Sequence, residues 1–346
     1  MLEVCACQAI TVDAEVLTGF LASLLVKLLL EKGHSVNMTV WDHVNEKKIS
    51  PLLALKSLGN LKLSRADLTD EASLNDPIAG GDTVFHVATP INFASEDPEI
   101  HMIKPAIEGV INVTNACAKL DTVKCVILTS SAAAITINQF DGKGLVMDEE
   151  NWSDAEFLTS KKPPTWGNFL NLLSAYPVSK ILAEKTARKF ARENNIDLIT
   201  IIPSLIAGPS LTPDIPPSIS LATSLITGNE SLINQLKGMQ ILSGSISLTH
   251  VEDVCRAHVF IAEKKSASGR YICCAVNSSF CELAKFLNER FSMYEIPTDF
   301  GEFPSEAKLI ISSVKIIKEG FSFKYGIEEI YDQSVVYLKA NDLLQN

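Results

Sequence analysis

The sequence predicts an α/β protein built on a doubly wound parallel sheet, followed by a smaller C-terminal α/β lobe. Three observations predict this fold. The 346 residues are 47% hydrophobic and 21% charged, so the chain can bury a large core without metals or disulfides. Apolar runs alternate with helical patterns through residues 1–205. After Ser204 the alternation gives way to a proline-rich stretch and a mixture of short strands and helices.

Five strands are expected in the first part of the chain, because each run is short, apolar and rich in Val, Ile or Leu. They are Ser35–Trp41, Leu61–Ala66, Thr83–Ala88, Lys124–Thr129 and Ile196–Ile202. Strands that alternate with helices form a parallel sheet that is covered on both faces. Residues 1–205 are therefore interpreted as one domain.

Helices are expected between these strands, at 19–32, 105–120 and 178–194. In the first of them the polar residues Ser23, Lys27 and Glu31 recur every four positions and leave the rest of the circumference apolar. This pattern predicts a helix that packs against the sheet and shows one polar stripe to water.

The remainder of the chain, 206–346, is interpreted mostly as a substrate-binding lobe. Gly208-Pro209, Pro213 and Pro216-Pro217 interrupt regular structure, and an amphipathic helix is expected at Ile327–Leu344. We expect this lobe to pack at the carboxyl ends of the strands, where open α/β sheets bind ligands, and some of its segments to return to the first domain.

Charge and hydropathy exclude several classes of protein. The chain has 30 basic and 41 acidic residues, a formal charge of -11, and no Lys/Arg run, so nucleic acid is not an expected partner. The longest apolar stretch, Phe20–Leu30, is shorter than the roughly 20 residues of a membrane span and contains Lys27. Acidic residues at Glu3, Asp13 and Glu15 do not fit a signal peptide, and a cytoplasmic location is expected. The eight cysteines lack zinc-ligand spacing and are expected to be reduced thiols, with no metal bound.

A phenol and an ammonium group are one helical turn apart in Tyr176-Pro-Val-Ser-Lys180. Residues at i and i+4 share a helix face, and a positive charge favours the phenolate, so Tyr176 could exchange a proton near neutral pH. The spacing alone is common, and a surface pair is the alternative. Its position on the helix after a strand that ends in Ser130-Ser131 favours a catalytic pair.

A Rossmann-type sheet opens with a glycine-rich turn that brings a helix N-terminus to a pyrophosphate. Residues 15–22 of this chain read Glu-Val-Leu-Thr-Gly-Phe-Leu-Ala and contain a single glycine, Gly19. Taken alone, this turn is weak evidence for a dinucleotide site, and an ordinary connection from a strand to a helix is the favoured interpretation.

The order of these motifs resembles the extended short-chain dehydrogenase/reductases, and specifically their plant dihydroflavonol reductase branch. Within that branch, residues 91–97, 163–167 and 237–245 are similar to the anthocyanidin reductase family, and the resemblance runs from about residue 18 to the C-terminus. The motifs that carry it are a nucleotide turn, Val84-Phe-His-Val-Ala-Thr-Pro90, Leu128-Thr-Ser-Ser131, Tyr176-x-x-x-Lys180 and Ile202-Pro-Ser-Leu-Ile-Ala-Gly-Pro209.

The resemblance implies an NADPH-dependent reductase that converts anthocyanidins to flavan-3-ols of the epicatechin type, in flavonoid and proanthocyanidin biosynthesis. It implies that Ser131 binds the substrate or orients the phenol, that Tyr176 is the acid/base group and that Lys180 holds the nicotinamide ribose. The implied cofactor contacts are Thr18, Gly19, Phe20, Leu21, Lys48, Asp67, Leu68, Val87, Ala88, Thr89, Tyr176, Lys180, Pro203, Ser204 and Ser218.

The implied substrate is a planar polyphenol, which fits an apolar slot with a few fixed hydrogen-bonding groups. Expected walls of this slot are Ile91, Phe93, Trp166 and the turn at Pro216-Pro217. Ordinary core or loop packing is the alternative for these side chains.

Two departures from the family pattern concern the cofactor. Val16 and Leu17 occupy positions where the family has glycine, and a left-handed backbone costs a residue with a Cβ roughly 1–2 kcal/mol. Trp41-Asp42 stands where the family usually has an arginine for the 2'-phosphate. Lys47 and Lys48 could reach that phosphate, and Trp41 could stack on the adenine.

The third departure is an insertion at Asn168–Ala175. A helix running through it would place Pro177 in its interior, at a cost of about 3 kcal/mol. We therefore expect a bulging loop, with Ser174 as the N-cap of a helix that carries Pro177 in its first turn. These departures leave two alternatives to an active reductase of anthocyanidins: a dihydroflavonol 4-reductase, and a cofactor-impaired, non-catalytic relative that binds flavonoids or partner proteins.

Overall fold

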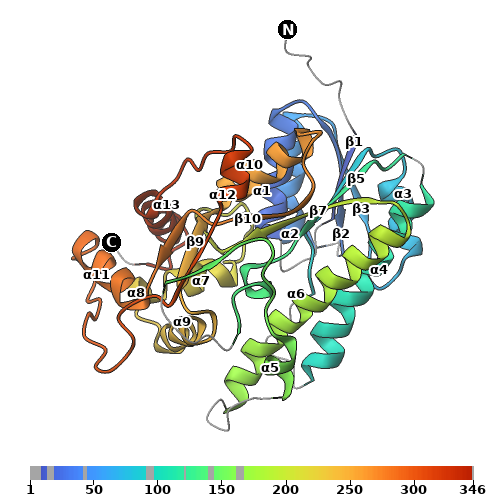
Figure 1. Ribbon diagram of the computed structural model, residues 1–346. Helices are drawn as coiled ribbons and strands as arrows, with labels where there is room; N and C mark the ends of the chain where they lie inside the picture. The colour runs from blue at the N-terminus through green and yellow to red at the C-terminus, as the bar shows by residue number, and fades with distance from the viewer. Residues whose placement is uncertain are drawn as a thin grey trace.

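The structure, a computed structural model, describes residues 9–13, 19–41, 45–90, 97–120, 122–138, 144–160 and 167–344. Within these ranges a seven-stranded sheet of order β10-β7-β5-β4-β1-β2-β3 forms the centre of the molecule (Figure 1). All its neighbouring strands are parallel, which confirms the predicted α/β fold. The strands are β1 (Ala9–Asp13), β2 (Ser35–Val40), β3 (Leu61–Arg65), β4 (Thr83–His86), β5 (Cys125–Thr129), β7 (Asp197–Pro203) and β10 (Gly269–Cys273).

The five expected strands correspond to β2, β3, β4, β5 and β7, and the sequence analysis did not name the other two, β1 and β10. Val12 of β1 is in register with Met38 on one side and Phe85 on the other. The strand order reverses at β1. On one side of it lie β2 and β3, and on the other lie β4, β5, β7 and β10. The crevice at such a reversal is where doubly wound sheets bind ligands.

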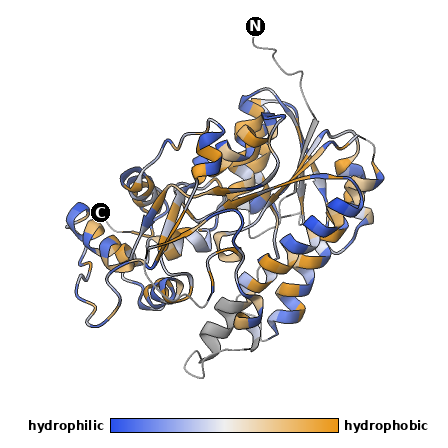
Figure 2. Ribbon diagram, in the orientation of Figure 1, coloured by the Kyte–Doolittle hydropathy of each residue, from blue (hydrophilic) through white to orange (hydrophobic). Residues whose placement is uncertain are grey.

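Helices cover both faces of this sheet. Phe85, Ile127 and Ile199 point to the face covered by α1 (Gly19–Glu31) and α10 (Val251–Glu263). On the other face, Val84, Val126 and Leu198 pack with α3 (Ala72–Ile78), α4 (Lys104–Lys119) and α6 (Gly167–Glu193). The central strands β4, β5 and β7 are mostly hydrophobic, as Figure 2 shows, because helices cover both of their faces. The edge strand β3 is more polar, and its Lys62 and Arg65 are exposed.

The predicted loop at Asn168–Ala175 is wrong. Helix α6 is continuous from Gly167 to Glu193 and contains Pro177. The insertion adds just over two turns at 3.6 residues per turn, and three leucines and an alanine give it good helix-forming residues. Pro177 cannot donate to the carbonyl of Leu173, yet the helix continues through it, so Tyr176 and Lys180 keep their i,i+4 relation.

Two smaller sheets lie beside the main one, and strands of the C-terminal part contribute to both. The first has the order β11-β9-β8 and the second pairs β12 with β6. Their strands are β6 (Leu145–Met147), β8 (Leu205–Ala207), β9 (Ile246–His250), β11 (Val276–Ser278) and β12 (Leu309–Ile311). The helices here are α7 (Pro217–Ala222), α8 (Ser224–Thr227), α9 (Glu230–Ser243), α11 (Phe280–Arg290), α12 (Val314–Lys318) and α13 (Ile327–Ala340).

This part has its own core, in which Phe280, Leu283 and Tyr331 are fully buried. The segment 251–273 leaves it and returns to the main sheet as α10 and β10. The remaining elements connect the main sheet and its crossovers: α2 (Glu46–Ala54), η1 (Leu55–Leu58), η2 (Glu99–Ile103), η3 (Ala132–Ala134) and α5 (Ala155–Ser160). Among the helices that the structure describes, none is long and apolar enough to cross a membrane.

Candidate active site

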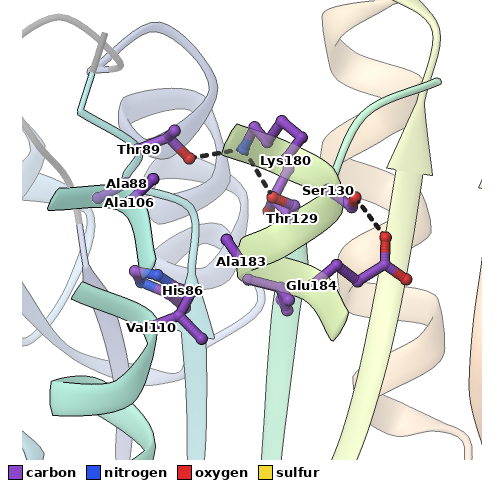
Figure 3. Close-up of a pocket in the computed structure, with 11 residues that line it drawn as sticks. His86, Ala88, Thr89, Ala106, Val110, Thr129, Ser130, Lys180, Ala183 and Glu184 are labelled. Atoms are coloured by element: carbon purple, nitrogen blue, oxygen red, sulfur yellow. Dashed lines mark hydrogen bonds between the residues drawn. The ribbon is translucent and has the colours of Figure 1, made fainter. Parts of the chain in front are cut away.

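Lys180 reaches the carboxyl edge of the main sheet from α6. Its ammonium donates hydrogen bonds to Thr89 Oγ1 at 2.6 Å and to the carbonyl of Thr129 at 3.1 Å (Figure 3). The side chain is only 6% exposed, and this burial lowers the pKa of Lys180 to about 8, against the attraction of Glu184, which raises it. Lys180 is therefore a charged donor whose proton is held less tightly than that of a surface lysine.

Tyr176 lies one turn earlier on α6, and Lys180 Nζ is 5.9 Å from the centre of its ring. Burial raises the pKa of the phenol, and a hydrogen bond with the side chain of Ser131 lowers it. The sequence analysis expected the charge of Lys180 to favour the phenolate of Tyr176. In the structure that charge is not among the causes that shift the pKa of Tyr176, and the ammonium points to Thr89 and Thr129. Tyr176 is thus a protonated phenol at neutral pH, suited to give a proton away.

Ser131 follows β5 and caps the short helix η3. Its Oγ accepts a 3.2 Å hydrogen bond from the backbone N–H of Ala133, so its own proton is free for the Tyr176 oxygen. The structure thus brings Ser131, Tyr176 and Lys180 together at one edge of the sheet. Their catalytic roles stay a prediction.

A small cavity of about 10 Å³, roughly the room for one water molecule, lies behind Lys180. It is lined by Thr89, Thr129, Ser130 and Glu184 among others, and Figure 3 shows Glu184 below Lys180 with Ser130 turned toward it. Ser130 donates to Glu184 Oε2 at 2.6 Å. The sequence analysis did not single out Glu184, although its position four residues after Lys180 on the same helix face was a usable signal.

A buried histidine supports the same edge from the other face of the sheet. His258 is fully buried, and its Nδ1 lies 2.8 Å from the carbonyl of Val254. A carbonyl only accepts, so Nδ1 carries the proton and Nε2 accepts from the Thr129 hydroxyl at 2.8 Å. Burial lowers the pKa of His258 to about 4, which keeps the ring neutral. The sequence analysis missed His258 because its partner lies far away in the chain.

The predicted cofactor turn is described only in part. Thr18 lies outside the described residues, as do Val16 and Leu17. Gly19 begins α1, and the side chains of Phe20 and Leu21 are buried in the core. A ligand at the N-terminus of α1 could therefore contact these two residues only through their backbone groups. The first turn of α1 has no acidic residue, which suits an anion there.

Asp67 and Leu68 follow β3 on the expected adenine side. Burial opposes ionisation of Asp67, but hydrogen bonds from Thr69 and Trp41 and the charge of Arg65 hold its pKa below the ordinary value. Trp41 is 49% exposed beside it. The Leu68 side chain is buried, and its carbonyl accepts a 2.7 Å bond from Asn112.

Lys48 lies in the first turn of α2, where its backbone N–H donates to the Asn45 side chain. The neighbouring Lys47 forms an ion pair with Asp214, with Nζ 2.9 Å from Oδ1. The loop that carries Asp214 also approaches the start of α1, since a Cβ on Gly19 would lie 3.3 Å from Thr212 Cγ2. A segment of the C-terminal part therefore lies against the start of α1.

Most of the other expected contacts line the same edge of the sheet. Val87, Ala88 and Thr89 are buried at the end of β4, and Thr89 contacts Lys180 directly. Pro203 ends β7, and Ser204 Oγ lies 2.7 Å from Thr249 Oγ1. Ser218 is half-buried in the first turn of α7, after Pro216 and Pro217. The other expected walls, Ile91, Phe93 and Trp166, lie outside the described residues.

The sequence matches the family model "NAD dependent epimerase/dehydratase family" over residues 17–274. It is 70% identical over 329 residues to an anthocyanidin reductase ((2S)-flavan-3-ol-forming) of Vitis vinifera, covering 95% of both chains. Identity to a dihydroflavonol 4-reductase of Callistephus chinensis is lower, 41% over 328 residues, covering 94% of this chain and 85% of the relative.

Two solved structures are similar over nearly the whole chain. Vestitone reductase from alfalfa (Medicago sativa L.) aligns with a TM-score of 0.80 and 32% identity, covering 97% of this chain and 100% of that one. Gre2 from Candida albicans in complex with NADPH aligns with a TM-score of 0.77 and 25% identity, covering 96% and 99%.

Proposed function

Because this chain belongs to the NAD dependent epimerase/dehydratase family and, within it, to the anthocyanidin reductases, we propose that it reduces anthocyanidins to flavan-3-ols with NADPH. The observation that carries this proposal is the arrangement of Tyr176, Lys180 and Ser131 at the carboxyl edge of the sheet, where it can serve a nicotinamide reductase. The lower identity to a dihydroflavonol 4-reductase favours anthocyanidins as substrates.

The described residues fit a nicotinamide dinucleotide. The N-terminus of α1, free of acidic residues, would face the pyrophosphate, and Val87, Ala88 and Thr89 would line its ribose side. Lys180 would donate to the nicotinamide ribose, and Pro203 and Ser204 would border the carboxamide. Lys47 and Lys48 would attract the 2'-phosphate, against the overall charge of -11.

Converting a flavylium cation to a flavan-3-ol adds two hydrides and one proton. Two molecules of NADPH, bound in succession, would each supply one of these hydrides. The protein supplies the proton, and the raised pKa of Tyr176 keeps that proton on its Oη at neutral pH. Ser131 stabilises the phenolate left behind by donating to its oxygen, and Lys180 adds a positive charge nearby.

The proposal assigns residues 206–346 mostly to substrate binding, with Pro216, Pro217 and Ser218 near the nicotinamide end. It also includes a cytoplasmic location. All six cysteines among the described residues are free, as expected in a reducing compartment.

Product analysis with cyanidin and dihydroquercetin, each incubated with the purified chain and NADPH, tests the proposal. We expect a flavan-3-ol from cyanidin at the higher rate. Turnover of dihydroquercetin alone would show that a dihydroflavonol, and not an anthocyanidin, is the substrate. Absence of NADPH binding at millimolar concentration would favour the cofactor-impaired alternative.

A further inference from the structure

Glu184 lies one turn after Lys180 on α6, in the interior of the protein. Its side chain is 1% exposed, and both of its oxygens are engaged. Arg270 Nε donates to Oε1 at 2.7 Å, and Ser130 donates to Oε2 at 2.6 Å. A buried carboxylate with both oxygens hydrogen-bonded has a fixed orientation.

Arg270 holds that carboxylate from β10. Its Nη1 donates to the carbonyls of Glu149 and Asn151, each at 2.7 Å, and its Cζ lies 3.8 Å from the centre of the Trp152 ring. With 4% exposure, the guanidinium has little freedom to leave Glu184. The ion pair therefore joins the edge strand of the sheet to the helix that carries Tyr176 and Lys180.

The direct partners of Lys180 are both neutral, the Thr89 hydroxyl and the Thr129 carbonyl. The titratable groups around it are Tyr176 and Glu184 on α6, His86 on β4 and, one contact further away, His258 on α10 and Arg270 on β10. Of these described residues, Glu184 is the carboxylate, and its charge opposes the loss of the lysine proton that burial favours.

We propose that Glu184, oriented by Arg270 and Ser130, is a positioning residue that acts through Lys180, keeping the charge on the ammonium that contacts Thr89 and Thr129. The inference rests on the proposed function, because a charged Lys180 is what the ribose contact and the phenolate of Tyr176 need. Without the Glu184 charge, Lys180 would lose its proton at a lower pH.

The test measures the pKa of Lys180 in the full-length chain by competitive labelling with acetic anhydride across pH, with peptide mass spectrometry as the readout. In Glu184→Gln we expect this pKa to fall by about one unit. Because Glu184→Gln leaves Arg270 buried without its partner, the double variant Glu184→Gln/Arg270→Gln removes both charges. Glu193→Gln, an exposed carboxylate later on the same helix, is the matched control.

Positioning by Glu184 predicts the lower Lys180 pKa in both the single and the double variant and no change in Glu193→Gln. An unchanged pKa in the single variant, or a shift that disappears in the double variant, would overturn the proposal. With cyanidin and NADPH, the alkaline limb of the kcat profile should move to lower pH by the same amount. If the wild type does not turn cyanidin over, the proposed function fails, while the Lys180 titration still decides the role of Glu184.

Discussion

Thr89 accepts a 2.6 Å hydrogen bond from the ammonium of Lys180, and this bond joins the end of β4 to α6 at the carboxyl edge of the sheet. Replacing Thr89 with valine keeps the side-chain shape and removes this acceptor. Since a hydrogen bond to a charged group contributes about 1.5–3 kcal/mol, kcat/KM should fall about 10- to 100-fold. Steady-state kinetics with Thr159→Val as an exposed control checks this, and wild-type kinetics in Thr89→Val would contradict it.

Tyr176 is predicted to give the proton to the substrate. Tyr176→Phe should lower kcat by about 10²- to 10⁴-fold while NADPH binding and the melting temperature change little, because only the phenolic oxygen is removed. Turnover and cofactor affinity are measured on the same preparation, with Tyr294→Phe as a control outside the site. Undiminished turnover would reject the acid role.

Pro177 lies inside the continuous helix α6, where it removes one backbone hydrogen bond. Pro177→Ala should therefore raise the free energy of unfolding by about 1–3 kcal/mol, less whatever packing the ring contributes. Pro217→Ala is the matched control, because that proline begins α7 after the extended Pro216, where the missing N–H has no intrahelical partner. Equal, small effects at both sites would favour the loop that the sequence predicted.

His258 has a pKa of about 4 in the folded protein, below the ordinary value of 6.5. A depressed pKa means that the unfolded chain binds a proton that the folded chain does not. Protonation of this histidine in the unfolded chain therefore lowers the free energy of unfolding as the pH falls from about 6.5 to about 4. The total loss is about 3 kcal/mol, and above pH 6.5 there is none. Urea unfolding at pH 7 and pH 4.5 should show a smaller loss for His258→Asn than for the wild type. Identical losses would contradict a buried neutral imidazole, and the exposed His101→Asn is the control.

The ion pair between Lys47 and Asp214 occupies one of the two lysines expected at the 2'-phosphate. Asp214→Asn frees Lys47, so the Kd for NADPH should fall about two- to fivefold, with little change for NADH. Lys47→Gln should have the opposite effect. Fluorescence titrations at low and at 0.5 M salt measure this, and equal effects on NADPH and NADH would show that Lys47 does not meet the 2'-phosphate.

Five strands of the main sheet could be predicted from the sequence because each is a short, largely apolar run, whereas β10, which returns from the C-terminal part, was not named. The segment Ala9–Asp13 was not named, since it precedes a turn that departs from the family pattern, and its place between β2 and β4 depends on pairing with distant strands. Pro177 misled the prediction for the opposite reason, because a local rule about proline was outweighed by helix formation along the rest of the segment.

The Tyr176–Lys180 pair was readable as an i,i+4 spacing, and the resemblance supplied Ser131. The partners of Lys180 were harder to predict. Thr89 follows β4 and Thr129 ends β5, and the contact of Glu184 with Arg270 joins residues 86 positions apart. No periodicity in the sequence reports such a contact, which arises only when β10 returns to the edge of the sheet.

The rate of NADPH oxidation on addition of cyanidin, in wild type and Tyr176→Phe at matched concentration, tests the central claim most directly. A reductase that uses Tyr176 as its acid predicts cyanidin-dependent oxidation in the wild type, with a flavan-3-ol as product, and its near loss in the variant. No cyanidin-dependent oxidation by the wild type at millimolar NADPH would contradict the account.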